Sequence, residues 1–407
     1  MNWEESSMVE WKAIEELGTF FGGLTGKSKK DFDNGNAKFI TYMNVFSNPS
    51  LSGSVVGEVK INEGEKQNKI HKGDILFTGS SETPQEAGMS CVVTEEPPED
   101  YYMNSFCFGL RLYNDDCNLD YFKHLLRSNN VRKDISKSAS GVTRFNISKS
   151  RFGKISLPIP SLEEQNRIVR ILDTFTDAIE NLKQQIDQRR KQYACIIDEC
   201  YGGSFKVLMQ KSESGEIMVE PLSKHGNFIR GKRFVRTDIV DEGQPCIHYG
   251  DMYTYYGLCT DKAKTHLPAD FPKKMRYAEK GDVVIVGAGE NNEDIGVGLV
   301  WQGEHPAAVH DACYIYKSDL NPMYVSYFLR SGIYHLQIKS NVVRGKICSI
   351  SSDGIGRAMI PVYSKEKQQK IVEMLVPFES LLSNLQKQLE LRQKQYEYYR
   401  NELLTFE

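Results

Sequence analysis

The chain has 407 residues, of which 40% are hydrophobic and 26% are charged, and its formal net charge is −3. This length predicts two or more domains. The nearly balanced charge gives no sign of a generally basic protein. Any surface that binds nucleic acid therefore has to come from local basic patches.

Cysteine usage and hydropathy indicate the compartment. The nine cysteines are scattered, with no Cys-x-x-Cys pair and no Cys/His cluster at metal spacing, which favours reduced thiols over disulfides or a zinc site. The opening segment MNWEESSMVEWK lacks an apolar core, and no run of about 18 apolar residues follows. We expect a cytoplasmic protein with no signal peptide and no membrane span.

Residues 1–160 are predicted to form a first domain of mixed α and β structure. Short β-rich runs separated by Gly, Asn, Asp and Pro predict strands at 39–42, 74–78, 90–94 and 105–112, and a helix is expected at 119–128. Pro158-Ile159-Pro160 then ends the extended chain, so the domain is expected to stop there.

A long helix is predicted at 161–202, and it recurs at 363–407. Segment Glu163–Tyr193 matches Glu366–Tyr396 without a gap at a constant offset of 203 residues, and 13 of 31 positions are identical. Apolar residues in both copies alternate at steps of four and three, which indicates a heptad seam and a left-handed supercoil with a partner helix. We expect the two copies to form an antiparallel coiled coil; a long helix packed on its own domain is the alternative.

Local signals mark the helix ends and one break. Ser161-Leu162-Glu163-Glu164 fits a capping box, Gly202-Gly203 ends the first helix, and the polar stretch Gln210–Glu216 is predicted to be a linker. Pro377 lies inside the second heptad pattern. It is expected to kink that helix or to mark a fresh start, because proline removes a backbone donor.

The segment 203–362, linker included, repeats the first domain. Lys72-Gly73-Asp74 recurs as Lys280-Gly281-Asp282, each heading a predicted strand, and Tyr121–Arg127 recurs as Tyr324–Arg330. The offsets drift between 203 and 210, so the loops differ while the framework persists. We predict an α+β chain in which one domain-plus-helix module is used twice, with internal two-fold pseudo-symmetry.

Motifs for catalysis are weak. Gly287-Ala288-Gly289 and Gly296-Val297-Gly298 look like dinucleotide loops, but neither opens a convincing helix, so turns between strands are expected. Gly26-Lys27-Ser28 lacks the upstream glycine of a phosphate-binding loop. The histidines at 248, 266, 305 and 310 are isolated along the sequence, which favours core or surface roles.

Basic loops recur at matching places in the two modules. Residues 132–154 carry seven Lys/Arg against one acid, and the early loop at 27–30 matches the loop at 230–236. Basic residues among Ser, Thr, Asn and Gly suit contacts with phosphates and base edges, whereas a single such loop is more often only solvated. The candidate DNA-binding residues are Lys27, Lys29, Lys30, Tyr42, Asn44, Ser80, Ser81, Arg144, Asn146, Arg230, Lys232, Arg233, Tyr249, Asn291, Asn292, Arg344 and Lys346.

Several motifs together resemble the specificity subunits of type I DNA restriction–modification enzymes, most closely the type IC group. They are Ile168–Phe175, Pro158-Ile159-Pro160 before Glu164-Gln165, Glu390–Arg400, and Val9–Lys12 through Gly22-Gly23. The resemblance covers the whole chain and is strongest in the helices. Pro377, and Lys367 where the first copy has Glu164, depart from it.

The resemblance implies a DNA-recognition and scaffolding role. It implies target-recognition domains at 1–160 and, with the linker, at 203–362, each reading half of a bipartite double-stranded target, while the helices at 161–202 and 363–407 set the spacer. It also implies two methyltransferase subunits that hold S-adenosylmethionine, and restriction subunits that use ATP and magnesium. Candidate docking residues repeat on the two helices: Gln165, Asn181, Gln185, Lys191 and Gln192, then Gln368, Asn384, Gln388, Lys394 and Gln395.

We expect the chain itself to be non-catalytic, with no cofactor or metal of its own. A stand-alone DNA adenine methyltransferase and a structural coiled-coil adaptor are the alternatives. The missing cofactor motifs count against the first of these.

Overall fold

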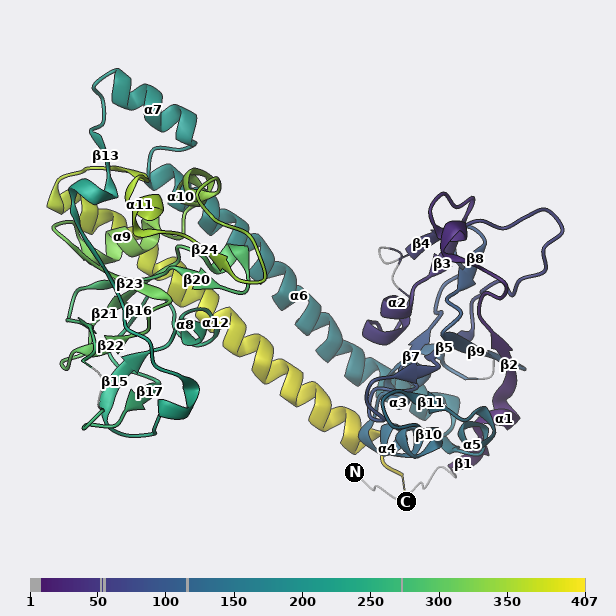
Figure 1. Cartoon of the computed structure of the whole chain (residues 1–407). Helices are drawn as coiled ribbons and strands as arrows, with labels where there is room; N and C mark the ends of the chain where they lie inside the picture. The colour runs from purple at the N-terminus through teal and green to yellow at the C-terminus, as the bar shows by residue number, and fades with distance from the viewer. Residues whose placement is uncertain (1–8, 52, 54–55, 115–116, 272–273, 407) are drawn as a thin grey trace. The chain divides into compact units, whose positions relative to one another are not determined.

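A computed structural model describes residues 9–51, 53, 56–114, 117–271 and 274–406 (Figure 1). The chain divides into two compact units, one made of Met1–Lys183 with Lys387–Glu407 and the other of Gln184–Gln386. Each unit contains one mixed α/β domain and parts of both long helices. The architecture is α+β, as predicted.

The first domain alternates short strands and short helices. Its strands are β1 (Glu10–Ala13), β2 (Gly18–Gly22), β3 (Ala37–Ile40), β4 (Val56–Val59), β5 (Asp74–Thr78), β6 (Ser80–Ser81), β7 (Ser90–Val92), β8 (Tyr101–Met103), β9 (Cys107–Leu112), β10 (Ala139–Ser140), β11 (Phe145–Ile147) and β12 (Ser156–Ile159). Its helices are α1 (Ile14–Leu17), the 3-10 turn η1 (Lys29–Phe32), α2 (Tyr42–Ser47), α3 (Leu119–Leu125), α4 (Asn129–Ser138) and α5 (Lys149–Gly153).

Four sheets organise this domain, and the smallest is the antiparallel pair β1-β12. The largest has the order β2-β9-β5-β7, a second has the order β4-β3-β8, and β10-β11-β6 form a third. Strand β5 is buried along its whole length and lies where the sequence predicted it. Its Phe77 packs edge-on against Phe152 of α5 at 4.9 Å between ring centroids, so the sheet is joined to the helices that follow it.

The second domain repeats this framework. Its strands are β13 (Val219–Pro221), β14 (Gly226–Arg230), β15 (Gln244–Ile247), β16 (Cys259–Thr260), β17 (Thr265–Leu267), β18 (Tyr277–Ala278), β19 (Val283–Val286), β20 (Ala288–Gly289), β21 (Gly298–Trp301), β22 (Ala307–Val309), β23 (Cys313–Ser318), β24 (Cys348–Ser349) and β25 (Met359–Pro361). Its helices are η2 (Leu222–Lys224), η3 (Arg236–Asp238), α8 (Tyr249–Thr254), η4 (Asn292–Asp294), α9 (Pro322–Phe328), α10 (Gly332–Ile338) and α11 (Ser352–Gly356).

The repeated Lys-Gly-Asp segments show why the framework matches. Gly73 and Gly281 have φ of 91° and 92°, a conformation that favours glycine. The carboxylate of the following aspartate accepts a hydrogen bond from a backbone amide three residues earlier, His71 before Asp74 and Glu279 before Asp282. The same turn therefore starts strand β5 in one module and leads into β19 in the other.

The long helices are α6 (Leu162–Cys200) and α12 (Lys365–Leu403), each 39 residues long and offset by 203 at both ends. Ser161 Oγ accepts from Glu164 N, as an N-cap should. The Glu164 carboxylate pairs with Arg167 instead of completing the predicted capping box. Gly202 and Gly203 follow α6 with φ of 101° and 89°.

Helix α12 runs through Pro377 without a break, so the proline does not start a new helix. Pro377 and Glu373, whose carbonyl loses its partner, are both exposed. We infer that water can take the place of the missing amide there, which lowers the cost of the proline.

The predicted linker is partly helical. Residues Phe205–Glu213 form α7, because Ser204 caps its start through Val207 N and Leu208 is fully buried. The polar composition of Gln210–Glu216 concealed this helix, since only the first half carries the apolar contacts.

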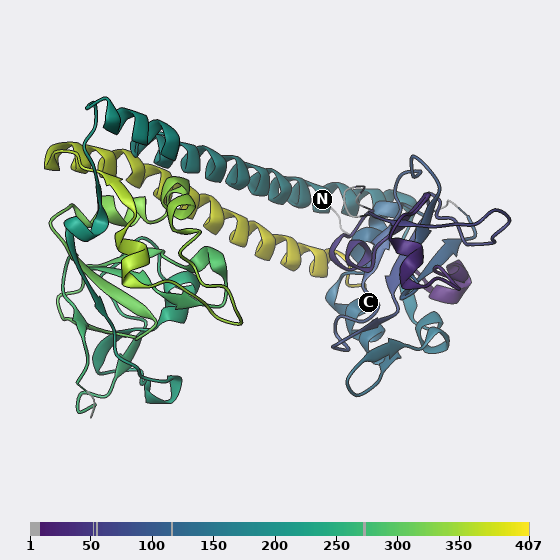
Figure 2. The same ribbon diagram turned by 45° about the horizontal axis from the view of Figure 1, so that its top comes forward.

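The two long helices pair within each unit (Figures 1 and 2). In the first unit, Phe175 of α6 stacks on Tyr399 of α12, with ring centroids 5.2 Å apart. In the second unit, Tyr193 of α6 stacks on Phe378 and donates a hydrogen bond to Glu379 at 2.9 Å. An early part of α6 meets a late part of α12 and the reverse, so the pair is antiparallel.

Candidate functional site

A cleft of 380 Å³ in the first domain gathers several of the predicted DNA-binding residues. It is lined by Tyr42, Met43, Phe46, Ser80, Ser81, Glu82, Glu86, Thr143 and Arg144. These residues come from the start of α2, from β6 and the loop after it, and from the turn between β10 and β11. These three segments are far apart in the sequence, and the pairing of β11 with β6 brings two of them together.

Hydrogen bonds hold this cleft in shape. Thr41 caps α2 by accepting from Asn44 N, which fixes the direction of Tyr42. The Tyr42 hydroxyl donates to the Ser80 carbonyl at 2.7 Å. Arg144 Nε donates to Ser80 Oγ at 3.2 Å, and its guanidinium lies over the Phe106 ring at 5.2 Å. These two contacts position the Arg144 side chain, and the residue remains exposed.

The second domain has a cleft at the matching place, with a volume of 570 Å³. It is lined by Arg233, Phe234, Val235, Arg236, His248, Tyr249, Ala288, Gly289, Glu290, His310, Asp311, Ala312 and Ile347. Tyr249 begins α8 as Tyr42 begins α2, and β20 takes the place of β6. An adjoining hollow shares Arg236, His248, Tyr249 and Glu290 and extends toward Lys264.

Two histidines are buried in the second cleft, although they are isolated in the sequence. His248 and His310 have ring centroids 4.7 Å apart. Burial, together with the neighbouring His310, lowers the pKa of His248 to about 4. Burial also lowers the pKa of His310, whose Nε2 donates to the Phe234 carbonyl. Both imidazoles are therefore neutral at pH 7, and they shape the cleft rather than add charge to it.

Two of the candidate residues have placements that argue against DNA contact. The Lys27 ammonium is bound by the Lys60 carbonyl and the Glu65 carboxylate, and its side chain is only 5% exposed. Asn44 is fully buried in α2, where its side-chain oxygen accepts from Asn48. Their roles are structural, because neither can reach a ligand without losing these partners.

The other candidates lie on exposed parts of the two domains. Arg230 donates to the Asp311 carbonyl beside the second cleft, and Asn291 donates to Asp294. Exposed positions are also found for Lys29, Lys30, Asn146, Lys232, Arg344 and Lys346. Of the predicted set, the first cleft collects Tyr42, Ser80, Ser81 and Arg144, and the second collects Arg233 and Tyr249.

The basic segment 132–154 offers fewer free cations than its composition suggested. Arg132 donates to the carbonyls of Gln85, Ala87 and Gly88, and burial lowers its pKa to about 10. It clamps the loop after β6 instead of facing solvent. His335 occupies the same position of α10, at an offset of 203.

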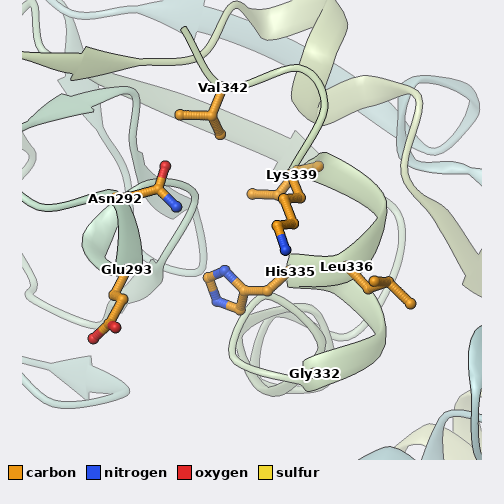
Figure 3. A pocket seen from close by; sticks show the side chains of 8 residues that line it. Asn292, Glu293, Gly332, His335, Leu336, Lys339 and Val342 are labelled. Carbon is orange, nitrogen blue, oxygen red and sulfur yellow. The ribbon is translucent and has the colours of Figure 1, made fainter. Parts of the chain in front are cut away.

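A separate pocket opens beside His335. It has a volume of 440 Å³ and is lined by Asn292, Glu293, Gly332, His335, Leu336, Ile338, Lys339 and Val342. Figure 3 shows Asn292 and Glu293 on one side, facing His335 and Lys339 on the other. The predicted residue Asn292 therefore lines this pocket and not the second cleft.

Sequence reasoning missed Glu82, Thr143 and Glu290, which the clefts bring beside the predicted residues. An internal comparison could have found the two glutamates, since Ser80-Ser81-Glu82 and Ala288-Gly289-Glu290 align at a constant offset of 208. Within the described residues, no group of three or more His, Cys, Asp or Glu side chains is arranged to hold a metal ion. None of the described helices has the length and apolarity needed to cross a membrane.

Two α/β domains with matching clefts, joined to an antiparallel helix pair, define a scaffold with two recognition modules. A family model described as a type I restriction modification DNA specificity domain matches residues 8–189. By this match, residues 8–189 carry a type I restriction modification DNA specificity domain, and the chain is similar to the specificity subunits of type I restriction enzymes.

Curated relatives and solved structures agree with this assignment. A putative type I restriction enzyme specificity subunit of Haemophilus influenzae is 24% identical over 66% of this chain and 68% of its own length. The Escherichia coli EcoR124I/EcoR124II specificity subunit is 26% identical over 62% of this chain and 63% of its own length. The S subunit structure from M. genitalium covers 100% of this chain and 99% of its own, with a TM-score of 0.53 at 17% identity, which shows the common fold.

Proposed function

We propose that each domain reads one half of a bipartite double-stranded DNA target through its cleft and the exposed basic residues around it. The observation that carries this proposal is the pair of matching clefts, each built from the start of a short helix and a short strand that follows the central strand. Arginines beside hydroxyl and amide groups can contact base edges and phosphates in the major groove. Two such clefts give one chain two DNA-recognition sites, one for each half of the target.

The exposed faces of α6 and α12 are the proposed docking surfaces for two methyltransferase subunits, one for each module. Asn181, Gln185, Asn384 and Gln388 are exposed at matching positions of the two helices. Equivalent surfaces should recruit equivalent partners. Gln165 and Gln368 are excluded from the proposed docking surface, because they are only 1% and 2% exposed and bind backbone groups of their own units.

The helix pair is also proposed to set the unread spacer between the half-sites. Each helix has 39 residues, and the offset of 203 holds at both ends while loop offsets vary. Loops can therefore change length without changing the helices, whereas an insertion in a helix extends it by about 1.5 Å per residue.

The chain itself is proposed to be a non-catalytic, cytoplasmic component of the enzyme. In this proposal the methyltransferase holds S-adenosylmethionine and methylates adenine, and the restriction subunit uses ATP and magnesium. The segments that resemble dinucleotide loops support a structural reading, since Ala288-Gly289 form strand β20 and pair with β24.

A binding experiment separates this proposal from a stand-alone methyltransferase and from a coiled-coil adaptor. The chain would be purified alone and with its methyltransferase, then tested on random-sequence duplexes for retention and for methyl transfer. The proposal expects sequence-selective retention by the complex and no methyl transfer by the chain alone. Methyl transfer by the isolated chain, or a complex without sequence preference, would contradict it.

A further inference from the structure

Each cleft contains a glutamate directly after its short strand, and the candidate residues included neither of these two. Glu82 directly follows β6 and lines the first cleft, and Glu290 directly follows β20 and lines the second. Both side chains are exposed. The two domains therefore place a carboxylate at the same position of the same kind of cleft.

Both carboxylates are unengaged. Among the described residues, neither Glu82 nor Glu290 forms a hydrogen bond or an ion pair, although arginines line both clefts. In the first cleft the neighbouring acid, Glu86, is already used, since it accepts from Ser81 and Thr83. Arg144 is positioned by Ser80 and Phe106 rather than by Glu82. Glu82 and Glu290 are thus free to accept from a ligand.

A free carboxylate is unfavourable on a surface that binds phosphates, because like charges repel. A carboxylate in both clefts becomes favourable if it accepts a hydrogen bond from a donor on the DNA. Phosphates have no such donor. In the major groove the donors are the exocyclic amino groups, N4 of cytosine and N6 of adenine.

We propose that Glu82 and Glu290 are specificity-determining residues that accept a hydrogen bond from an exocyclic amino group of cytosine or adenine, one in each half-site. This inference rests on the proposed function, since it names the base chemistry that each cleft reads. Glu82 acts on the half-site of the first domain only, and Glu290 on that of the second. Both carboxylates lower non-specific affinity while they add selectivity.

The experiment uses the full chain in complex with its methyltransferase and duplexes that carry the mapped target. Wild type is compared with Glu82→Ala and Glu290→Ala, and with Glu95→Ala as a matched control. Glu95 is also exposed and unpaired among the described residues, but it follows β7, past the Asp74 end of strand β5, whereas Glu82 lies past the Thr78 end. Selections from libraries randomised at each half-site give the preference at every base pair.

Glu82→Ala is expected to lose roughly 5- to 150-fold of discrimination at one base pair of one half-site. Glu290→Ala should do the same in the other half-site, and Glu95→Ala should change neither. Each cytosine or adenine outside the methylated adenine is then replaced by its N4-methyl or N6-methyl form. This replaces the major-groove hydrogen and keeps the base pair. Methylation at the base pair identified by the selections should weaken binding by the wild type. The alanine variant should bind the methylated and unmethylated duplexes equally well.

Glu82→Gln distinguishes the two bases. Glutamine bonds adenine through both N6 and N7, so a pair read as cytosine should shift toward adenine, and a pair read as adenine should keep its preference. Unchanged preferences in both alanine variants, or equal relaxation in Glu95→Ala, would overturn the inference. A wild-type complex without two half-sites would instead contradict the proposed function, so the two failures are distinguishable.

Discussion

The side-chain oxygen of Gln165, near the start of α6, accepts a hydrogen bond from the backbone N–H of Asn118 at 2.9 Å. Its Nε2 donates to the Pro160 carbonyl at 2.9 Å. Gln368 repeats both bonds, with Asn321 N and the Tyr363 carbonyl at 2.8 Å each. One buried amide in each module thus ties the long helix to the helix-capping segment of its domain.

Replacing Gln165 by Ala should destabilise the first unit by about 1–3 kcal/mol, because a buried backbone amide loses its acceptor. The matched control is Asn166→Ala, which removes only an exposed side-chain bond to Asn118 and should cost less than about 0.5 kcal/mol. Urea unfolding measures both. Equal midpoints for the two variants would show that the Gln165 bonds do not hold the helix in place.

Lys27 and Lys29 form a second matched pair. Lys29→Ala should weaken DNA binding on all sequences and reduce the slope of log affinity against log salt by about one, as expected for one lost phosphate contact. Lys27→Met should leave that slope unchanged and lower the unfolding midpoint, since the Glu65 carboxylate loses its ammonium partner. A reversed pattern would mean that Lys27, and not Lys29, faces the DNA.

The buried His248 predicts how stability depends on pH. Its folded-state pKa is lowered from 6.5 to about 4 by burial and by His310, with Arg236 acting in the same direction and Asp251 against it. The unfolded state therefore binds the proton more readily, so stability is present above pH 6.5 and is lost as the pH falls toward 4.

His248→Gln should flatten this pH dependence, measured as the urea midpoint from pH 7 to pH 4.5. His305→Gln, at an exposed position, should keep the wild-type curve. Carboxylates that titrate in the same range contribute equally to all three proteins, so the difference between curves isolates His248. A His248→Gln curve parallel to wild type would refute the burial argument.

An insertion in the helices tests their proposed role in spacing. Four helix-forming residues after Lys183, with four more after Gln386, should lengthen each helix by roughly 6 Å. The unread spacer should then grow by about one or two base pairs, at about 3.4 Å each, while the half-site sequences stay the same. Some stability should be lost, because four residues do not fit the heptad period. An active variant with the original spacer would show that something else sets the distance.

The sequence predicted the framework better than the site, for a physical reason. Strand β5 and the two long helices follow from periodicity and from end signals such as Gly202-Gly203, which are local properties of the chain. The placement of Lys27 depends on Glu65, and that of Arg132 on carbonyls at 85–88. Such long-range partners cannot be found in one sequence, so charge alone overstated the exposed basic surface.

The clefts were predictable only in part. Tyr42 was expected at the end of a strand and Arg144 in a basic loop, whereas Tyr42 begins α2. The contacts that gather them with Ser80 come from β11 pairing with β6 and from the Tyr42 bond to Ser80. Glu82 was not among the candidates, none of which is acidic. A comparison of the two modules could have identified Glu82, because Glu290 occupies the matching position in the second module.

The central claim, that each domain reads its own half of a split target, is tested most directly by mapping methylated adenines across a genome. The host would express the chain with its methyltransferase, either as wild type or as Arg144→Ala. The account predicts a bipartite motif for wild type, and for the variant a motif relaxed at one position of one half-site, costing about 1–3 kcal/mol of discrimination there. A continuous motif for wild type, or relaxation of both half-sites by Arg144→Ala, would contradict it.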